Sequence, residues 1–149
     1  METFLLLMDG IGTALIPLNL GLLIFGCLIG LFVGAMPGLG SVNGVAILIP
    51  ITFIVPPTAA IIFLAAVYYG AMYGGAISSI MLGIPGASTA VATVFDGRPL
   101  AQKGDAITGL TAAAVGSFVG GTVSVILFTL FAPPLAKVAL AFNAPETFA

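Results

Sequence analysis

From residue 10 to residue 95 the chain carries no side chain that is charged at neutral pH. A soluble domain normally has charged side chains at about 25% of its positions. This chain of 149 residues has them at 5% and is 60% hydrophobic, so it cannot coat a water-facing surface and lipid must be its main solvent. At roughly 20 residues per crossing, the uncharged stretch is long enough for two or three membrane spans.

The composition also argues against several classes of function. Three basic residues and a net charge of -2 do not provide the clustered Lys and Arg that nucleic acid binding requires. Because the chain has no His and a single cysteine, Cys27, it holds neither an internal disulfide nor a zinc site built from Cys and His. The internal acids Asp96 and Asp105 have no His beside them to act as a base, so we expect no enzyme and no bound cofactor.

Three segments have the length and apolar character of membrane-spanning helices, namely residues 18–36, 58–82 and 106–131. Each contains small residues spaced four apart, such as Gly26, Gly30 and Gly34 in the first segment. Helices in lipid associate through close packing, so these ridges favour helix–helix contact. An amphipathic helix over residues 2–16 is expected to precede them, and the pair Pro133 and Pro134 is expected to end the third.

Two Pro-Gly pairs interrupt the apolar stretches. The first break holds Pro37, Gly38, Gly40, Ser41, Asn43 and Gly44. Residues 45–55, which include Thr52, are too short to span a bilayer and are expected to form a half-helix or a re-entrant hairpin arm. The second break, residues 84–89, holds Pro85, Gly86, Ser88 and Thr89. We therefore predict an all-α integral membrane protein, a multi-helix bundle with Gly- and Pro-broken helices.

A helix that breaks at membrane depth is the feature most informative about function. Backbone groups facing lipid cost several kcal/mol each unless protein or a water-filled cavity surrounds them. Transporters use such breaks because half-helix N-termini favour anions and free carbonyls coordinate cations. Both breaks are therefore expected to bind substrate or ion, with Tyr73 and Ser78 as further candidates. The alternatives are a plain surface turn at each break, an interfacial aromatic role for Tyr73 and hydrogen bonding of Ser78 within its own helix.

One segment is clearly polar. It runs from Asp96 to Asp105 and includes Gly97, Arg98, Pro99, Lys103 and Gly104. We expect residues 96–105 to be a solvated connecting loop, with Asp105 capping the helix that follows. The positive-inside rule favours the cytoplasmic side for its two basic residues.

Several motifs stand in a characteristic order along the chain. They are GAMPGLG at residues 34–40, Gly44 with PIT at 50–52, YYGAMYGG at 68–75, IPG at 84–86 and DGRPLAQKG at 96–104. Together they resemble the large membrane subunit of bacterial tripartite tricarboxylate transporters, over nearly the whole chain. The chain looks shorter than a complete family member. We therefore expect residues 1–149 to form a single transport domain, the N-terminal part of a longer protein and of a larger secondary-transporter fold.

The resemblance implies a multi-pass carrier in the bacterial inner membrane that takes up citrate-like tricarboxylates or related carboxylates. It implies coupling to an ion gradient, of Na+ or H+, and two protein partners: a small membrane subunit and a periplasmic solute-binding protein. The two breaks would form the substrate and ion region. The alternative is another ion-coupled carrier, or a channel-like membrane protein, that works without a binding protein.

Overall fold

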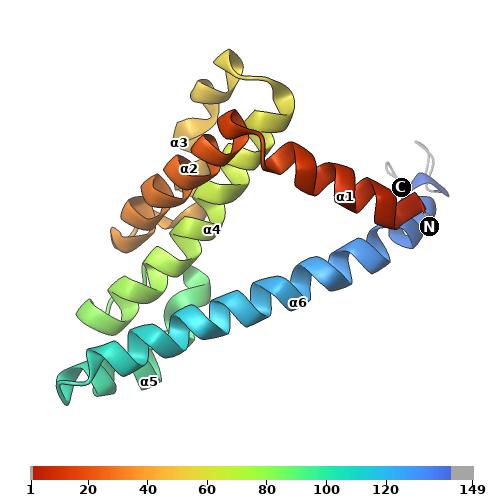
Figure 1. The fold of residues 1–149 in the computed structure, drawn as a ribbon. Coiled ribbons are helices and arrows are strands. Elements are labelled where there is room, and N and C mark those ends of the chain that lie inside the picture. The colour runs from red at the N-terminus through yellow and green to blue at the C-terminus, as the bar shows by residue number, and fades with distance from the viewer. Residues whose placement is uncertain (1, 142–149) are drawn as a thin grey trace, which may run out of the picture. The chain divides into compact units, whose positions relative to one another are not determined.

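The computed structural model describes residues 2–141, and these are helical throughout their regular structure, with no strand among them. The elements are α1 (Glu2–Ala14), α2 (Pro17–Ala35), α3 (Gly40–Leu48), the 3-10 helix η1 (Ile49–Ile54), α4 (Pro57–Leu82), the 3-10 helix η2 (Ser88–Ala90), α5 (Val91–Gln102) and α6 (Ala106–Ala141) (Figure 1). Contacts divide the chain into two units, Met1–Ala113 and Ala114–Ala149, so that α6 begins in the first and continues in the second. The predicted all-α membrane fold is confirmed.

Within residues 2–141, three helices are long and apolar enough to cross a bilayer, namely Pro17–Ala35, Pro57–Leu82 and Ala106–Ala132 within α6. They match the three predicted spans to within a residue at each end. The expected helix end at Pro133 is wrong, because α6 continues through both prolines to Ala141. Proline's fixed φ is compatible with a helix, and membrane helices tolerate the lost backbone donors.

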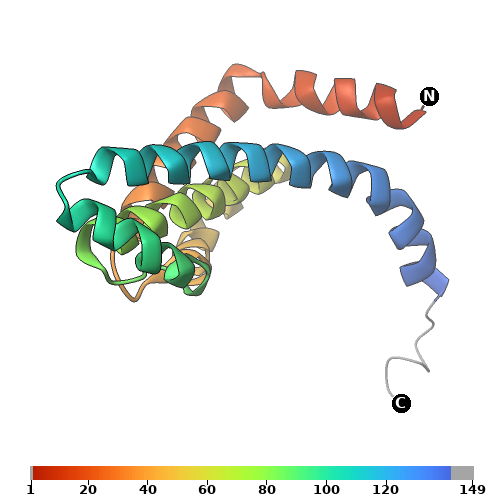
Figure 2. The ribbon, with the colours of Figure 1, turned by 90° about the horizontal axis from the view of Figure 1, so that it is seen from below.

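The core of the first unit is the pair α2 and α4, which lie side by side (Figures 1 and 2). Gly26 at the middle of α2 faces Phe63, and Gly34 near its end faces Ala71. Residue numbers therefore rise together along the two helices. This register means that α2 and α4 run parallel.

The predicted glycine ridges bring the two backbones into contact. A Cβ added at Gly30 would lie 2.9 Å from the carbonyl carbon of Val67, and one added at Gly70 would lie 3.1 Å from that of Cys27. Each helix thus presses its glycines against the other's main chain. Since lipid tails are as apolar as the side chains, this close packing is what holds such helices together.

The parallel order of α2 and α4 determines the path between them. The chain must return from the end of α2 to the level at which α4 begins, and α3 and η1 carry it there. Their nine α-helical and six 3-10 residues rise about 25 Å, close to the roughly 30 Å of a hydrocarbon layer. The predicted half-helix is present, but it crosses back through the bundle instead of leaving on the side where it entered.

The re-entrant element lies after α4 instead. The helix ends at Gly83, whose φ of 73° is left-handed. The chain then turns back along α4 until the backbone nitrogen of Ala87 is 3.2 Å from the Cβ position of Gly75. From there α5 leads out again, and the guanidinium of Arg98 donates a hydrogen bond to the carbonyl of Met81 near the end of α4. Entering and leaving on one side defines a re-entrant hairpin.

The polar segment is mostly helical, which corrects the expectation of a loop over residues 96–105. Asp96, Gly97 and Pro99 belong to α5, and Lys103, Gly104 and Asp105 alone connect it to α6. Helix α5 can pack closely on α4 because Gly97 has no side chain. A Cβ at this position would lie 2.6 Å from Cγ1 of Ile80 and would be too close. This packing on an apolar neighbour outweighs the loop-like composition.

The expected cap at the start of α6 is confirmed. The carboxylate of Asp105 accepts hydrogen bonds from the backbone N–H of Thr108 at 3.4 Å and from its hydroxyl at 2.7 Å. The left-handed Gly104, with a φ of 87°, turns the chain just before this cap. The connection between α5 and α6 is therefore a tight turn of three residues, and the polar residues 96–102 precede it in α5.

Candidate functional site

The two breaks meet in the first unit. The first covers residues 36–39, so α3 begins at Gly40, five residues earlier than expected. The second covers residues 83–87 and leads into η2 at Ser88. A Cβ at Gly40 would lie 3.8 Å from the carbonyl oxygen of Gly86. The helical segments that follow the two breaks therefore start close to one another.

Gly86 forms the tightest contact between the second break and the core. An added Cβ would collide with the carbonyl oxygen of Gly34, and it would lie 2.6 Å from Oγ of Ser78 and 2.8 Å from Cα of Gly75. Gly86 is not among the glycines with positive φ. Glycine is thus needed here for close approach between backbones, and not for an unusual conformation.

The first break uses glycine for the opposite reason. Gly38 and Gly40 have φ values of 89° and 68°, a left-handed conformation that residues with a Cβ rarely adopt. A Cβ at Gly38 would meet no described atom within 4 Å, and Pro37 beside it is exposed. These glycines reverse the chain between α2 and α3 and leave the break uncrowded.

The meeting point lies well inside the length of α4. It is level with Gly75, and α4 continues to Leu82, so the end of the helix is about 10 Å further on. With its 26 residues, α4 is about 39 Å long, against roughly 30 Å for the hydrocarbon layer. If α4 is centred in the membrane, the point at which the two breaks meet lies within that layer. This depth disfavours the alternative of plain turns at the surface.

The polar side chains at the breaks differ in exposure. Asn43, Ser88 and Thr89 are exposed, whereas Ser41 in the first turn of α3 is only 6% exposed. The hydroxyl of Thr89 is 3.5 Å from the sulfur of Met72. Gly44 is buried because α3 packs there against α2. The structure thus leaves an amide exposed in the first turn of α3 and hydroxyls exposed at the start of η2, and a binding role for them stays a prediction.

Neither helical segment is capped by a side chain. Leu39, which precedes α3, and Ala87, which precedes η2, make no side-chain hydrogen bond to the turn that follows. The first N–H groups of a helix have no acceptor within the helix. Two sets of backbone donors are therefore presented near the breaks, and such donors favour a negatively charged ligand.

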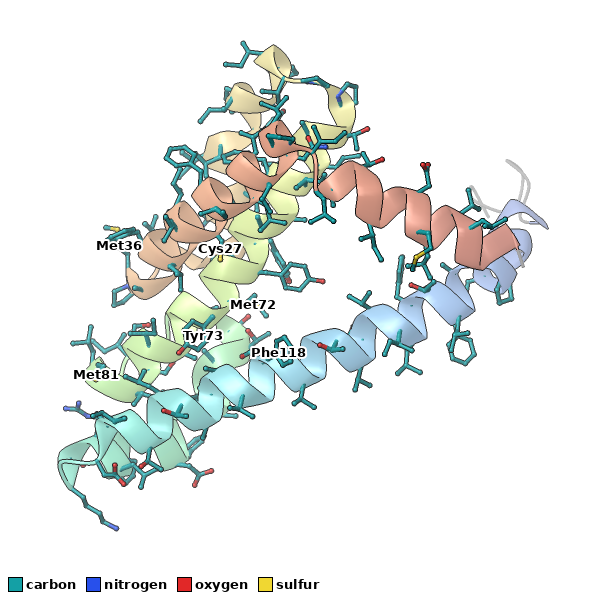
Figure 3. The ribbon with its side chains drawn as sticks, viewed as in Figure 1. Cys27, Met36, Met72, Tyr73, Met81 and Phe118 are labelled. Atoms are coloured by element: carbon teal, nitrogen blue, oxygen red, sulfur yellow. The ribbon has the colours of Figure 1, made fainter. Side chains whose placement is uncertain are left out.

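Three other predicted residues have hydroxyls that are already bonded. Ser78, 2% exposed, donates to a carbonyl of its own helix at 3.0 Å, and Thr52 donates within η1 at 2.6 Å. Both are hydrogen bonds within a single element, the alternative raised for Ser78. Tyr73, on α4 in Figure 3, donates to the carbonyl of Leu110 at the start of α6 at 3.3 Å. Thr52 lies on the return segment, away from the two breaks.

The residues that fasten the second break were not among the predicted site residues. The side chain of Arg98 lies along the end of α4, with Nε 3.2 Å from the Cβ position of Gly83, and Ser79 bonds the carbonyl of Ala90 at 3.0 Å. A signal existed for the arginine, because it is the first basic residue of a very apolar chain and a basic side chain is favourable at a helix C-terminus. Nothing in the sequence indicated that Ser79 would bond the segment after the second break.

Comparisons with known proteins agree with the motifs. A family model described as the tripartite tricarboxylate transporter TctA family matches residues 20–149. A protein of Agrobacterium vitis, named "Uncharacterized 52.8 kDa protein in TAR-I ttuC' 3'region", is 46% identical over 140 residues, which cover 94% of this chain and 28% of that protein. The chain therefore spans about 28% of the length of this relative. No solved structure matches. The chain belongs to the tripartite tricarboxylate transporter TctA family.

Proposed function

We propose that this chain is part of the membrane subunit of a carrier that takes up tricarboxylates or related carboxylates, driven by a gradient of Na+ or H+. The family is a transporter family, and three helices are suited to span a membrane. We place the protein in the bacterial inner membrane and assign it no enzymatic activity. Its partners would be a small membrane subunit and a periplasmic solute-binding protein, with the rest of the subunit completing the carrier.

The observation that carries this proposal is the meeting of the two breaks inside the length of α4. Gly40 and Gly86 bring the start of α3 close to the start of η2. Each start presents backbone N–H groups, and a helix N-terminus carries roughly half a positive charge. The exposed Asn43 adds a side-chain hydrogen-bonding group in the first turn of α3, and the exposed Ser88 and Thr89 add two at the start of η2. This combination suits a carboxylate and requires no basic side chain.

A multiply charged anion at low dielectric nevertheless needs more countercharge than two helix ends provide. The stretch between Asp9 and Asp96 holds no basic residue. The guanidinium of Arg98 donates to the carbonyl of Met81 and is placed against the end of α4. A sodium ion or proton bound together with the substrate would supply the remaining charge, and it would also explain coupling to an ion gradient.

Linked binding of substrate and cation is the test. In the intact transport system, substrate affinity should rise with the concentration of the coupling cation, and by linkage the cation should bind more tightly when substrate is present. Asn43→Ala and Ser88→Ala should weaken both affinities together. Thr129→Val, which removes a hydroxyl bonded within α6, is the control. A substrate affinity that is indifferent to Na+ and to pH would place the countercharge elsewhere in the protein and refute this mechanism.

A further inference from the structure

We infer that Ser79 is a positioning residue that holds the substrate-binding end of the second break in place, an inference that rests on the proposed function. Ser79 lies in α4 with none of its surface exposed. Its hydroxyl oxygen is 2.8 Å from the carbonyl oxygen of Gly75 and 3.0 Å from that of Ala90. Ala90 is the last residue of η2 and is 4% exposed. One buried hydroxyl thus links α4 to the segment that follows the break.

This hydrogen bond is the second of two attachments to one face of α4. Gly75 and Ser79 are one helical turn apart, so they lie on the same face. Gly75 faces Ala87 at the start of the attached stretch, with 3.3 Å between their Cβ positions, and Ser79 bonds Ala90 at its end. Residues 88–89 lie between the attachments and are exposed. The two attachments therefore hold the backbone N–H groups at the start of η2 in place and leave residues 88–89 exposed.

The neighbouring serine provides a matched comparison. Ser78 is 2% exposed and its hydroxyl also donates to Gly75, at 3.0 Å, but its recorded hydrogen bond stays within α4. Alanine at either position removes one buried hydroxyl and one contact with the same carbonyl. Alanine at Ser79 alone also removes the bond between α4 and η2. Because Oγ of Ser78 lies 2.6 Å from the Cβ position of Gly86, the two variants compare the hydrogen bond to η2 with a packing contact at the same break.

Losing the bond to Ala90 should loosen η2 and move its N–H groups away from their binding geometry. A binding site tolerates displacements of only about 0.5 Å, so substrate affinity should fall by about three- to tenfold, the range of one buried hydrogen bond between neutral groups. The maximal uptake rate and the melting temperature should change much less. A purely structural role would lower the amount of folded protein and leave the affinity of the remainder unchanged.

The experiment has two readouts. The first is the rate at which a maleimide alkylates the thiol introduced by Ser88→Cys, in a Cys27→Ala background, with and without Ser79→Ala or Ser78→Ala. The second is carboxylate affinity in the transport system, measured with Ser88 intact. Ser79→Ala should change the alkylation rate severalfold and weaken affinity as stated above. Ser78→Ala should have a smaller effect on both.

An unchanged alkylation rate in Ser79→Ala, or equal effects of the two alanine variants, would overturn the inference. If the unsubstituted system binds no carboxylate, the proposed function fails and the alkylation rates alone decide the role of Ser79. A rate altered by Ser79→Ala more than by Ser78→Ala would then still show that this hydroxyl positions the break.

Discussion

Gly86→Ala is the substitution that tests the meeting of the breaks most directly, because the added methyl group has no room. It would collide with the carbonyl oxygen of Gly34 and stand 2.6 Å from Oγ of Ser78 and 2.8 Å from Cα of Gly75. Carbon contacts are optimal at roughly 3.5–4.0 Å, so the second break would have to move outward by about 1 Å. Overpacking costs about 1–3 kcal/mol, and we expect the upper end because two of the neighbours are backbone atoms.

A displacement of that size should weaken substrate binding more than it unfolds the protein. The second break is a short stretch, and the contact between α2 and α4 would remain. If about 3 kcal/mol falls on the substrate-bound state, the affinity decreases by roughly 100-fold. The assays are concentration-dependent carboxylate uptake at equal amounts of membrane-inserted protein and thermal unfolding of the purified protein.

Two other glycines separate crowding from backbone conformation. The methyl group of Gly38→Ala would meet no described atom within 4 Å, but the residue must adopt a φ of 89°. This conformation costs about 1 kcal/mol. If that cost falls on the substrate-bound state, substrate affinity decreases roughly fivefold. Gly38→Asn should recover part of this loss, because asparagine tolerates the left-handed region. Gly116→Ala, in α6 with no described atom within 4 Å, should be neutral or slightly stabilising. Gly109 is a poor control, since it is buried and its Cβ would contact Ile80 at 3.4 Å.

The ranking of these variants is the result that matters. Gly86→Ala should be the most damaging, Gly38→Ala intermediate and Gly116→Ala harmless. If Gly86→Ala takes up substrate and melts like the unsubstituted protein, the second break does not pack against the end of α2. The site built on the meeting of the two breaks would then have to be abandoned.

Two further predictions concern how the breaks are held. In a Cys27→Ala background, Val33→Cys with Gly44→Cys should form a disulfide on oxidation, because the two Cβ positions are 3.6 Å apart and disulfides need about 3.5–4.5 Å. Mass spectrometry would detect it, and the exposed Asn43→Cys paired with Val33→Cys should not cross-link. Arg98→Gln should lower stability by about 1–2 kcal/mol, because the charge-assisted hydrogen bond at the end of α4 is lost. The stability of Arg98→Lys should lie between those of the glutamine variant and the unsubstituted protein. Identical melting of the glutamine variant and the unsubstituted protein would rule out that role.

The sequence was sufficient to predict the three long apolar helices and the two breaks that follow α2 and α4. Apolar length located α2, α4 and the spanning part of α6, since that signal depends on local composition alone. The Pro-Gly pairs located the breaks for the same reason, because the conformational limits of proline and glycine act within a few residues. Spacing of small residues correctly indicated that α2 and α4 pack on their glycines.

Features that depend on tertiary packing could not be predicted in this way. The return path of α3 and η1 follows from the parallel register of α2 and α4, which no single segment encodes. Residues 96–102 were expected to be a loop because they are polar, yet packing at Gly97 on Ile80 keeps them helical. The close approach of Gly86 to Gly34, Ser78 and Gly75 could not be predicted either, because close approach leaves no trace in the local sequence that distinguishes it from turn formation.

The contacts of Gly34 join helix packing and the candidate site in one place. Its missing side chain lets the end of α2 lie against Ala71 of α4, and its carbonyl oxygen is the group that a methyl at Gly86 would strike. Helices in lipid gain little from the hydrophobic effect and depend on such close contacts. The second break can therefore reach the first only where α2 and α4 approach closely. In this chain the glycine ridges that hold the bundle together also set the depth at which the two breaks meet.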